Sequence, residues 1–196
     1  MVRIALVGNP NVGKSVIFNA LTGLNQTIAN FPGCTVEKKE GELNYQQQQI
    51  DVIDLPGIYS LSSHSIDEKI TREYIIEQEI DLVIAVLDAS NLERNLYLTV
   101  QLMELNVHLL IALNMVDLAK GKGIDIDANR LTKNLGIPVI ETVASKNIGI
   151  DELKGKICSM LNSPNVSQPI IFEKKIEESI DSAIKIFDEY SSRIER

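Results

Sequence analysis

The chain of 196 residues is long enough for one complete domain with a sizeable core and leaves little for a second. Its 27 acidic residues outnumber its 19 basic ones, and the net charge of −8 disfavours a protein that binds RNA or DNA through a broad basic face. Every apolar stretch is far shorter than the roughly eighteen residues of a membrane span, and the two cysteines, Cys34 and Cys158, are expected to be reduced thiols.

Short apolar runs alternate with longer helical patterns, which predicts an α/β fold with a mostly parallel sheet and helices on both faces. In chain order we expect a strand at 3–7, a helix at 14–21, strands at 37–43 and 48–53, a helix at 67–77, a strand at 81–87, a helix at 92–105, a strand at 107–113, a helix at 128–135, a strand at 138–141 and a helix at 151–161. The sheet then has six strands. The polar pair at 37–53 is expected to be an antiparallel hairpin on one edge, joined across Asn44 and Tyr45, with the four glutamines at 46–49 near its tip.

The chain changes character after residue 161. Residues 162–169 are rich in Asn, Ser and Pro, which predicts a linker. Beyond the linker a helix is expected at 173–194, and its apolar residues at helical spacing are Ile176, Ile180, Ala183, Ile184 and Phe187. A lone amphipathic helix needs a surface to cover its apolar face. Either it packs back on the domain of residues 1–161, or residues 170–196 begin a second, truncated helical domain.

The sequence from Gly8 to Ser15 matches the phosphate-binding loop in full, directly after the first strand. Its backbone N–H groups would surround a β-phosphate, and the helix that begins at Lys14 would add the positive end of its dipole. Lys14 would supply charge to the β- and γ-phosphates, and Ser15 a hydroxyl to Mg²⁺. The residues that we expect to contact the phosphates are Asn9, Pro10, Asn11, Val12, Gly13, Lys14, Ser15 and Val16. A simple Gly-rich turn would not need a lysine followed by a serine.

Two further segments are expected near the γ-phosphate. In Asp54-Leu55-Pro56-Gly57, Asp54 can reach Mg²⁺ through a water, and Gly57 can offer its N–H to the γ-phosphate. Such a tetrapeptide also forms ordinary turns, but its place one hairpin after the phosphate loop favours the functional role. Thr35, in the loop 30–36, is the second hydroxyl ligand that we expect for Mg²⁺, although alone it would be explained more simply as a threonine at a strand entrance.

The choice of base is expected at the ends of two later strands. Asn114, Met115 and Asp117 are expected to bind the nucleotide there. Asp117 can accept hydrogen bonds from the N1–H and the exocyclic amine of guanine, and adenine lacks that donor pair. A backbone N–H in the stretch Val143, Ala144 and Ser145 would meet the guanine O6. Four motifs in this order predict a Ras-like P-loop GTPase fold that binds GTP or GDP with Mg²⁺.

Five sequence blocks resemble the cytosolic G domain of the ferrous iron transport protein B (FeoB) family. They cover residues 8–15, 30–37, 54–61, 65–74 and 88–97. Phe31 and Cys34 depart from the family's more usual Asn-Trp-Pro-Gly-Val-Thr and leave Thr35 in place. The tail from Pro169 to Arg196 is similar to the first helix of the family's small helical domain, which slows GDP release.

The resemblance implies a GTPase switch on the cytoplasmic side of the cell membrane, attached to a membrane-embedded Fe²⁺ transporter in the same polypeptide. It also implies that Asn11 holds K⁺ where an arginine finger otherwise reaches, although an asparagine after a proline also forms turns. Ile58 stands where Ras-type enzymes carry a glutamine that orients water, so hydrolysis is expected to be slow. We expect catalysis to depend on Lys14, Thr35, Gly57 and Asn11.

Other interpretations remain open at this point. A ribosome-assembly or tRNA-modifying GTPase shares the phosphate loop but would need an RNA-binding domain, and a regulatory module could bind nucleotide without hydrolysing it. No nucleic-acid partner is expected, and association into an oligomer stays open. His64, Asp67 and Glu68 suggest an iron sensor, but Ser65 and Glu68 fit a capping box that opens a helix. Arg94 would solvate a helix face, or lie near the base site as in the family.

Overall fold

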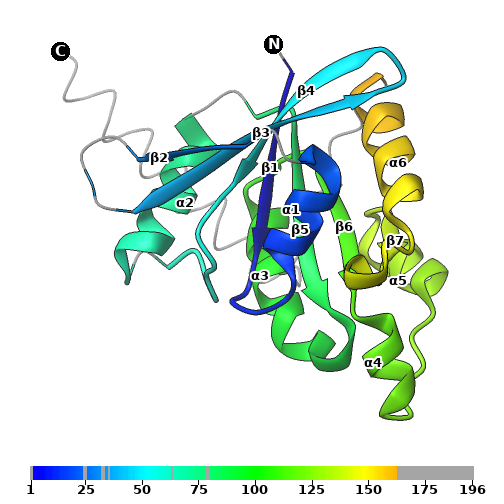
Figure 1. The fold of residues 1–196 in the computed structure, drawn as a ribbon. Helices are drawn as coiled ribbons and strands as arrows, with labels where there is room; N and C mark the ends of the chain where they lie inside the picture. Colours follow the sequence, from blue (N-terminus) through cyan, green and yellow to red (C-terminus); the bar gives the residue numbers. More distant parts are fainter. Residues whose placement is uncertain are drawn as a thin grey trace, which may run out of the picture.

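The computed structural model describes residues 2–23, 26–31, 34, 36–62, 64–77 and 80–162, and in these the strands form one sheet with helices on both faces (Figure 1). Seven strands lie in the order β2-β3-β4-β1-β5-β6-β7. The strands are β1 (Val2–Gly8), β2 (Gln26–Asn30), β3 (Glu37–Tyr45), β4 (Gln48–Asp54), β5 (Leu82–Asp88), β6 (Leu109–Asn114) and β7 (Val139–Glu141). The α-helices are α1 (Lys14–Thr22), α2 (Ile66–Glu77), α3 (Leu92–Glu104), α4 (Val116–Gly121), α5 (Ala128–Leu135) and α6 (Ile150–Asn162), and short 3₁₀ turns are η1 (Ala89–Asn91) and η2 (Ala144–Lys146).

The central strands are apolar along their whole length because both faces of the sheet are covered. In β1, Ile4 and Leu6 point to the core under α1 and α6, whereas Ala5 and Val7 point to the core under α2 and α3. Successive side chains of a strand alternate between faces, so one continuous apolar run serves two cores. The strands β4, β1, β5, β6 and β7 pair in parallel. The expected mostly parallel α/β sheet is therefore confirmed.

The prediction of six strands is wrong, because the segment 26–30 forms a seventh. β2 pairs antiparallel with β3 at the edge of the sheet, from Gln26 beside Gly41 to Asn30 beside Glu37. All five of its residues are exposed. With no apolar side to bury, the segment shows no alternation of apolar and polar residues, so its sequence does not predict a strand.

The hairpin of β3 and β4 is confirmed as antiparallel, but two details of its prediction are wrong. β4 lies inside the sheet, between β3 and β1, so β2 rather than the hairpin forms the edge. Asn44 and Tyr45 still pair with β4, and the turn falls on Gln46 and Gln47, whose φ angles are 47° and 65°. Two adjacent positive φ angles are those of a type I′ turn, and the usual Asn-Gly signal for it is missing here.

The carboxyl ends of the parallel strands meet at one edge of the sheet. β1 ends at Gly8, β4 at Asp54, β5 at Asp88 and β6 at Asn114. β1 lies between β4 and β5, so strands that come later in the chain lie on both sides of it. In open α/β sheets ligands bind at such a point, beyond the carboxyl ends of the strands. This edge is where the sequence places its motifs.

Several predictions concern the later part of the chain. α4 was not predicted, because it has only six residues and follows Met115, which has a φ of 61°. None of the helices within the described residues is long and apolar enough to span a bilayer. Asn162, where the predicted linker begins, is the last residue of α6, and the rest of that linker and the helix predicted at 173–194 lie outside the described residues. Cys158 lies on the buried face of α6, and burial raises the pKa of its thiol.

Candidate functional site

Two glycines let the loop between β1 and α1 lie close to its neighbours. A Cβ on Gly8 would lie 2.6 Å from the carbonyl oxygen of Val86, so only glycine fits beside β5. Gly13 has a φ of +85°, and a Cβ there would lie 2.3 Å from Nδ2 of Asn114. The spacing of glycines in the motif is therefore required by neighbours that are distant in sequence.

The loop borders a pocket of about 510 Å³ at the carboxyl edge of the sheet. Its lining residues are Asn9, Pro10, Asn11, Gly13, Lys14, Ser15, Val16, Gly57 and Met115. Of the residues that we expected to bind phosphates, only Val12 is absent from this lining, because its side chain is buried in the core. The structure thus brings the phosphate loop, Gly57 of the segment 54–57 and Met115 of the segment 114–117 to one cavity.

Lys14, Ser15 and Asp54 meet at the floor of the site. Lys14 Nζ donates to Oδ1 of Asp54 and to the carbonyl oxygen of Leu55. Ser15 Oγ donates to Oδ2 of Asp54 over 3.4 Å, and the Asp54 side chain is buried. A hydroxyl and a carboxylate oxygen are ligands that Mg²⁺ prefers, so the donor set at this point suits that ion.

The segment after β4 is fixed against the phosphate loop by its backbone. Leu55 N donates to the carbonyl oxygen of Leu6 over 3.2 Å, and Ile58 N donates to that of Gly8 over 3.1 Å. A Cβ on Gly57 would lie 3.3 Å from Cα of Pro10, so Gly57 permits a close approach. The Ile58 side chain is only 2% exposed and packs in the core. It is not available to orient a water molecule.

Thr35, the expected second hydroxyl ligand, lies outside the described residues. Its surroundings are partly described. Phe31 N donates to the carbonyl oxygen of Val36 over 3.0 Å, and Cys34 N donates to that of Phe31 over 3.2 Å. Cys34 packs against the apolar core under α2, in keeping with a small packing residue.

Asn114 joins three segments around the expected base site, and its side chain is 3% exposed. Its Nδ2 donates to the carbonyl oxygen of Val12 over 2.9 Å. Its Oδ1 accepts from Thr142 Oγ1 over 3.1 Å and from Ala144 N over 3.0 Å. The side chain that we expected to contact nucleotide therefore ties the phosphate loop to the segment after β7.

Asp117 lies at the start of α4, with a partner that sequence reasoning missed. Lys146 Nζ donates to its Oδ2 over 2.7 Å, and Leu118 N donates to its Oδ1 over 3.0 Å. The Lys146 hydrogen bond is the main reason why the pKa of Asp117 lies below its ordinary value, against a smaller opposing effect of burial. Lys146 directly follows the expected Val143, Ala144 and Ser145, of which Ser145 is exposed and the other two are buried.

Two asparagines of the phosphate loop have unusual surroundings. Asn9 is 4% exposed, and its Oδ1 is buried without a hydrogen-bond partner among the described residues. Asn11 is exposed and has a φ of 67°, in the left-handed region that asparagine tolerates better than most residues. Both line the pocket and present oxygen atoms that could hold a cation.

The segment between Gly57 and α2 is held by side chains. Glu68 accepts hydrogen bonds from Ser60 Oγ over 2.8 Å, Ser62 Oγ over 3.1 Å and His64 N over 3.1 Å, and Glu68 N donates to Ser65 Oγ over 3.1 Å. The Ser60 hydroxyl is the largest of the influences that hold the pKa of Glu68 below its ordinary value. This is the predicted capping role, so Glu68 is engaged in structure at this point.

A second contact of this segment was not expected. The Arg94 guanidinium carbon of α3 lies 4.3 Å from the centroid of the Tyr59 ring. Gln101, seven residues later on the same face of α3, accepts a hydrogen bond from Leu61 N through Oε1 over 2.8 Å. Arg94 therefore contacts the segment after Gly57 rather than only solvating its helix. In the sequence, the spacing that places Arg94 and Gln101 on one helix face was the signal that could have predicted this contact.

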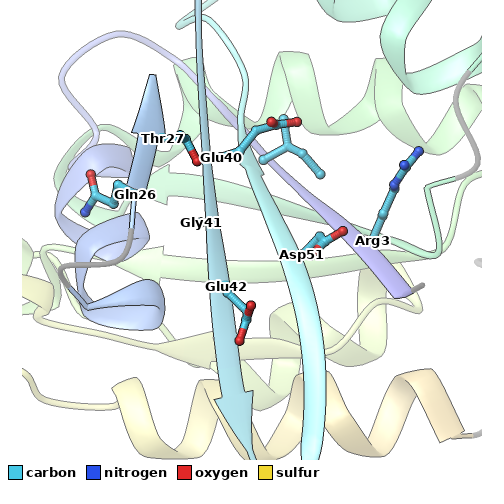
Figure 2. Close-up of a pocket in the computed structure, with 8 residues that line it drawn as sticks. Arg3, Gln26, Thr27, Glu40, Gly41, Glu42 and Asp51 are labelled. Carbon is cyan, nitrogen blue, oxygen red and sulfur yellow. The ribbon is translucent and has the colours of Figure 1, made fainter. Parts of the chain in front are cut away.

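A pocket of about 520 Å³ lies elsewhere, over β2, β3, β4 and the start of β1. Figure 2 shows carboxylates of Glu40, Glu42 and Asp51 on its walls, with Arg3 at one side. Three carboxylates disfavour a phosphate ligand there. Among the described residues, no group of three or more His, Cys, Asp or Glu side chains is placed to hold a metal ion.

The comparisons with known proteins all identify the same family. A sequence model of the family described as ferrous iron transport protein B matches residues 2–157. The Fe(2+) transporter FeoB of Escherichia coli (strain K12) is 46% identical over 179 residues, which cover 87% of this chain and 23% of that protein. FeoB of Methanocaldococcus jannaschii is 64% identical over 103 residues, which cover 53% of this chain and 15% of that protein. The chain spans less than a third of the length of these relatives.

Solved structures are similar over most of the chain. A GDP-bound mutant of S. thermophilus NFeoB has a TM-score of 0.88 and 41% identity, covering 95% of this chain and 72% of that one. The cytosolic domain of T. maritima FeoB in its GMPPNP form has a TM-score of 0.87 and 44% identity, covering 93% and 72%. The FeoB G-domain from Methanococcus jannaschii has a TM-score of 0.75 and 54% identity, covering 83% and 98%. The expected Ras-like P-loop GTPase fold is confirmed.

Proposed function

The chain belongs to the ferrous iron transport protein B family, and we propose that it is a Mg²⁺-dependent domain that binds GTP and hydrolyses it slowly to GDP and phosphate. The observation that carries the proposal is the meeting of Lys14, Ser15 and Asp54 beside the pocket that the phosphate loop borders. Bound nucleotide in the S. thermophilus relative, which is described as bound to GDP, supports guanine.

The residues have distinct roles in this proposal. The backbone N–H groups from Asn11 to Ser15 bind the phosphates, and Lys14 supplies a positive charge beside them. Ser15, Asp54 and Thr35 would hold Mg²⁺, which neutralises phosphate charge when bound. Gly57 offers its N–H to the γ-phosphate. Because Ile58 is buried, no side chain at that position aligns the attacking water, and slow turnover follows.

Base selection depends on residues that follow β6 and β7. Asp117 would accept the guanine N1–H and amine, and Lys146 holds the carboxylate in its ionised form. Asn114 keeps Ala144 beside the phosphate loop, so the base and phosphate sites stay at a fixed separation. Met115, two residues before Asp117, lines the pocket that the phosphate loop borders.

We further propose that the domain is joined to the membrane-embedded part of an Fe²⁺ transporter, on the cytoplasmic side of the cell membrane. The family match and the FeoB relatives, which are much longer than this chain, support that role. The same match disfavours a ribosome-assembly or tRNA-modifying GTPase. The nucleotide state would then be reported to the transporter through the segments at 25–36 and 55–65.

A direct experiment tests nucleotide binding and turnover. The parent chain should bind GDP, with binding of ADP weaker by at least about a hundredfold, and should release phosphate from GTP only when Mg²⁺ is present. Lys14→Ala should weaken GTP binding strongly, whereas Lys133→Ala, the same change on exposed α5, should not. Equal binding of ADP and GDP, or no phosphate release by the parent, would contradict the proposal.

Asn11 is proposed to hold K⁺ and so to accelerate hydrolysis. The buried Asn9 oxygen nearby is a second acceptor that a cation would satisfy. Because Asn11 has a positive φ, Asn11→Ala would also strain the backbone, so Asn11→Gly is the cleaner change. The parent should be faster in KCl than in NaCl at equal ionic strength, and Asn11→Gly should remove the difference. If the parent is equally fast in both salts, Asn11 only forms the turn.

A further inference from the structure

Three side chains from separate segments meet on the α2 side of the sheet. Phe31 follows β2, Lys38 lies in β3, and Tyr74 lies in α2. The Phe31 and Tyr74 rings pack edge to face, with centroids 5.5 Å apart and an interplanar angle of 83°. Lys38 Nζ lies 5.0 Å from the Tyr74 centroid and 6.0 Å from the Phe31 centroid. We refer to these three residues as the aromatic cluster.

The surroundings of the cluster favour a stable contact. Phe31 is only 4% exposed and packs in the core under α2. Edge-to-face pairs and cation contacts with rings are stronger where water is excluded. Lys38 also pairs with Glu40 over 2.6 Å, so its charge has a carboxylate partner. Burial lowers the pKa of Lys38, but hydrogen bonds to Glu40 and Tyr74 outweigh it and raise the pKa above its ordinary value.

The cluster connects the two segments that would approach the γ-phosphate. Phe31 N donates to the carbonyl oxygen of Val36, so the Phe31 ring is linked to both ends of the segment that contains Thr35. On the other side, α2 carries Glu68 near its start and Tyr74 six residues later, which is about 9 Å along a helix. Glu68 holds the segment after Gly57. One helix therefore contacts both segments.

We propose that Phe31, Lys38 and Tyr74 are positioning residues that couple the end of β2 to α2, and that the contact among them is made in one nucleotide state and lost in the other. The inference rests on the proposed function, because the coupling is defined by the difference between the GDP and GTP states. A ligand shifts such an equilibrium only through contacts that differ between the states. Removing the cluster should therefore change the ratio of the two affinities.

A double-mutant cycle measures this coupling. Phe31→Leu, Tyr74→Leu and the double variant are titrated with GDP and with a non-hydrolysable GTP analogue in saturating Mg²⁺. Each single change should shift the ratio of the two affinities in the same direction by about two- to tenfold, the range expected for one aromatic pair. The double variant should shift it no further, because the two changes remove the same contact.

Milder variants separate coupling from general damage to the fold. Lys38→Arg keeps the charge and should leave the ratio nearly unchanged, whereas Lys38→Met should shift it. Tyr74→Phe keeps the ring but removes the hydroxyl that hydrogen-bonds Lys38, so its shift should be smaller than that of Tyr74→Leu. Tyr45→Leu, at a partly buried tyrosine at the far end of β3 that packs on the other core, is the matched control and should leave the ratio unchanged. Thermal unfolding followed by circular dichroism confirms that each variant is folded.

The outcomes distinguish this inference from the proposed function. If the parent binds GDP and the analogue but the single changes leave the ratio unaltered, or their shifts add in the double variant, the coupling is wrong and the GTPase proposal stands. If the parent binds neither nucleotide, the proposed function fails and the coupling fails with it. Equal shifts in both singles, without a further shift in the double, support the cluster.

Discussion

Around the expected base site, the buried side chain of Asn114 holds three segments together, whereas in the segments expected near the γ-phosphate the stretch after Gly57 depends on Glu68 near the surface. We define the base end as residues 114–117 and 142–146, and the switch end as residues 31–36 and 55–68. Both ends use side-chain oxygen atoms as acceptors of several hydrogen bonds. They differ in how much water can reach those bonds.

That difference has a consequence for motion. Buried hydrogen bonds cannot be exchanged for bonds to water without opening the core, so the base end should open only at high free energy. Bonds near the surface can be replaced by water at little cost, and the switch end should open readily. We therefore expect the domain to bind the base at a rigid end and to change conformation with the nucleotide at the switch end, which opens more easily.

The largest expected effect is at the base end. Asn114→Ala removes the partners of the Val12 carbonyl, the Thr142 hydroxyl and the Ala144 amide, and should lower the free energy of unfolding by about 3 kcal/mol. Chemical denaturation measures the loss. Asn134→Ala, the same change on exposed α5, should cost less than about 0.5 kcal/mol. Similar losses in the two variants would show that Asn114 is not the tie between these segments.

Asp117→Asn should separate binding from folding at the same end. The amide cannot accept both guanine donors, so GDP affinity should fall by about a hundredfold and xanthosine diphosphate should bind better than to the parent. Asp117 is partly exposed, so the free energy of unfolding should stay nearly unchanged. Asp125→Asn, at an exposed position after α4, is the control. Unaltered GDP affinity in Asp117→Asn would remove this residue from the base site.

Lys146→Met should have a smaller, pH-dependent effect. Lys146 lowers the pKa of Asp117, so in the parent the carboxylate stays ionised as the pH falls, until the pH reaches that lowered pKa. Without Lys146 the pKa should rise, and the loss of GDP affinity should begin at a higher pH. The ratio of variant to parent affinity, measured between about pH 7 and pH 4, reports this shift. Lys133→Met, the control, should show the parent's profile. A profile of Lys146→Met that matches the parent's would contradict the role of Lys146.

The smallest effect on global stability is expected at the switch end. Glu68→Gln removes a charged acceptor of the Ser60, Ser62 and His64 bonds, and should lower the free energy of unfolding by about 1 kcal/mol or less. Amide exchange at residues 60–62 should nevertheless become about tenfold faster. Glu73→Gln, on the same helix, keeps the parent's exchange there. Because the pKa of Glu68 is lowered, its contribution should persist until the pH falls through that lowered pKa.

Sequence reasoning found the elements that depend on neighbouring residues. The first strand, the phosphate loop and α1 are consecutive, and their apolar pattern and glycines specify them directly. The capping of α2 by Ser65 and Glu68 was predicted for the same reason. The roles of Asp54 and Gly57 could be predicted from the order of the motifs along the chain.

What could not be predicted depends on contacts between distant segments. β2 is held by backbone bonds to β3 and has no apolar pattern of its own. Lys146 meets Asp117 only because β6 and β7 are neighbours in the sheet. The tie made by Asn114 spans 102 residues to Val12. A list of motifs identifies such residues as important, but only the packing shows which of them hold the fold.

The contrast between the two ends can be tested most directly by hydrogen exchange of the chain with saturating Mg²⁺ and either GDP or a non-hydrolysable GTP analogue. We expect protection to differ between the two nucleotides at residues 31–36 and 55–68, and to be the same in both at residues 114–117 and 142–146. Identical protection with both nucleotides throughout, or a difference as large at the base end as at the switch end, would contradict the account.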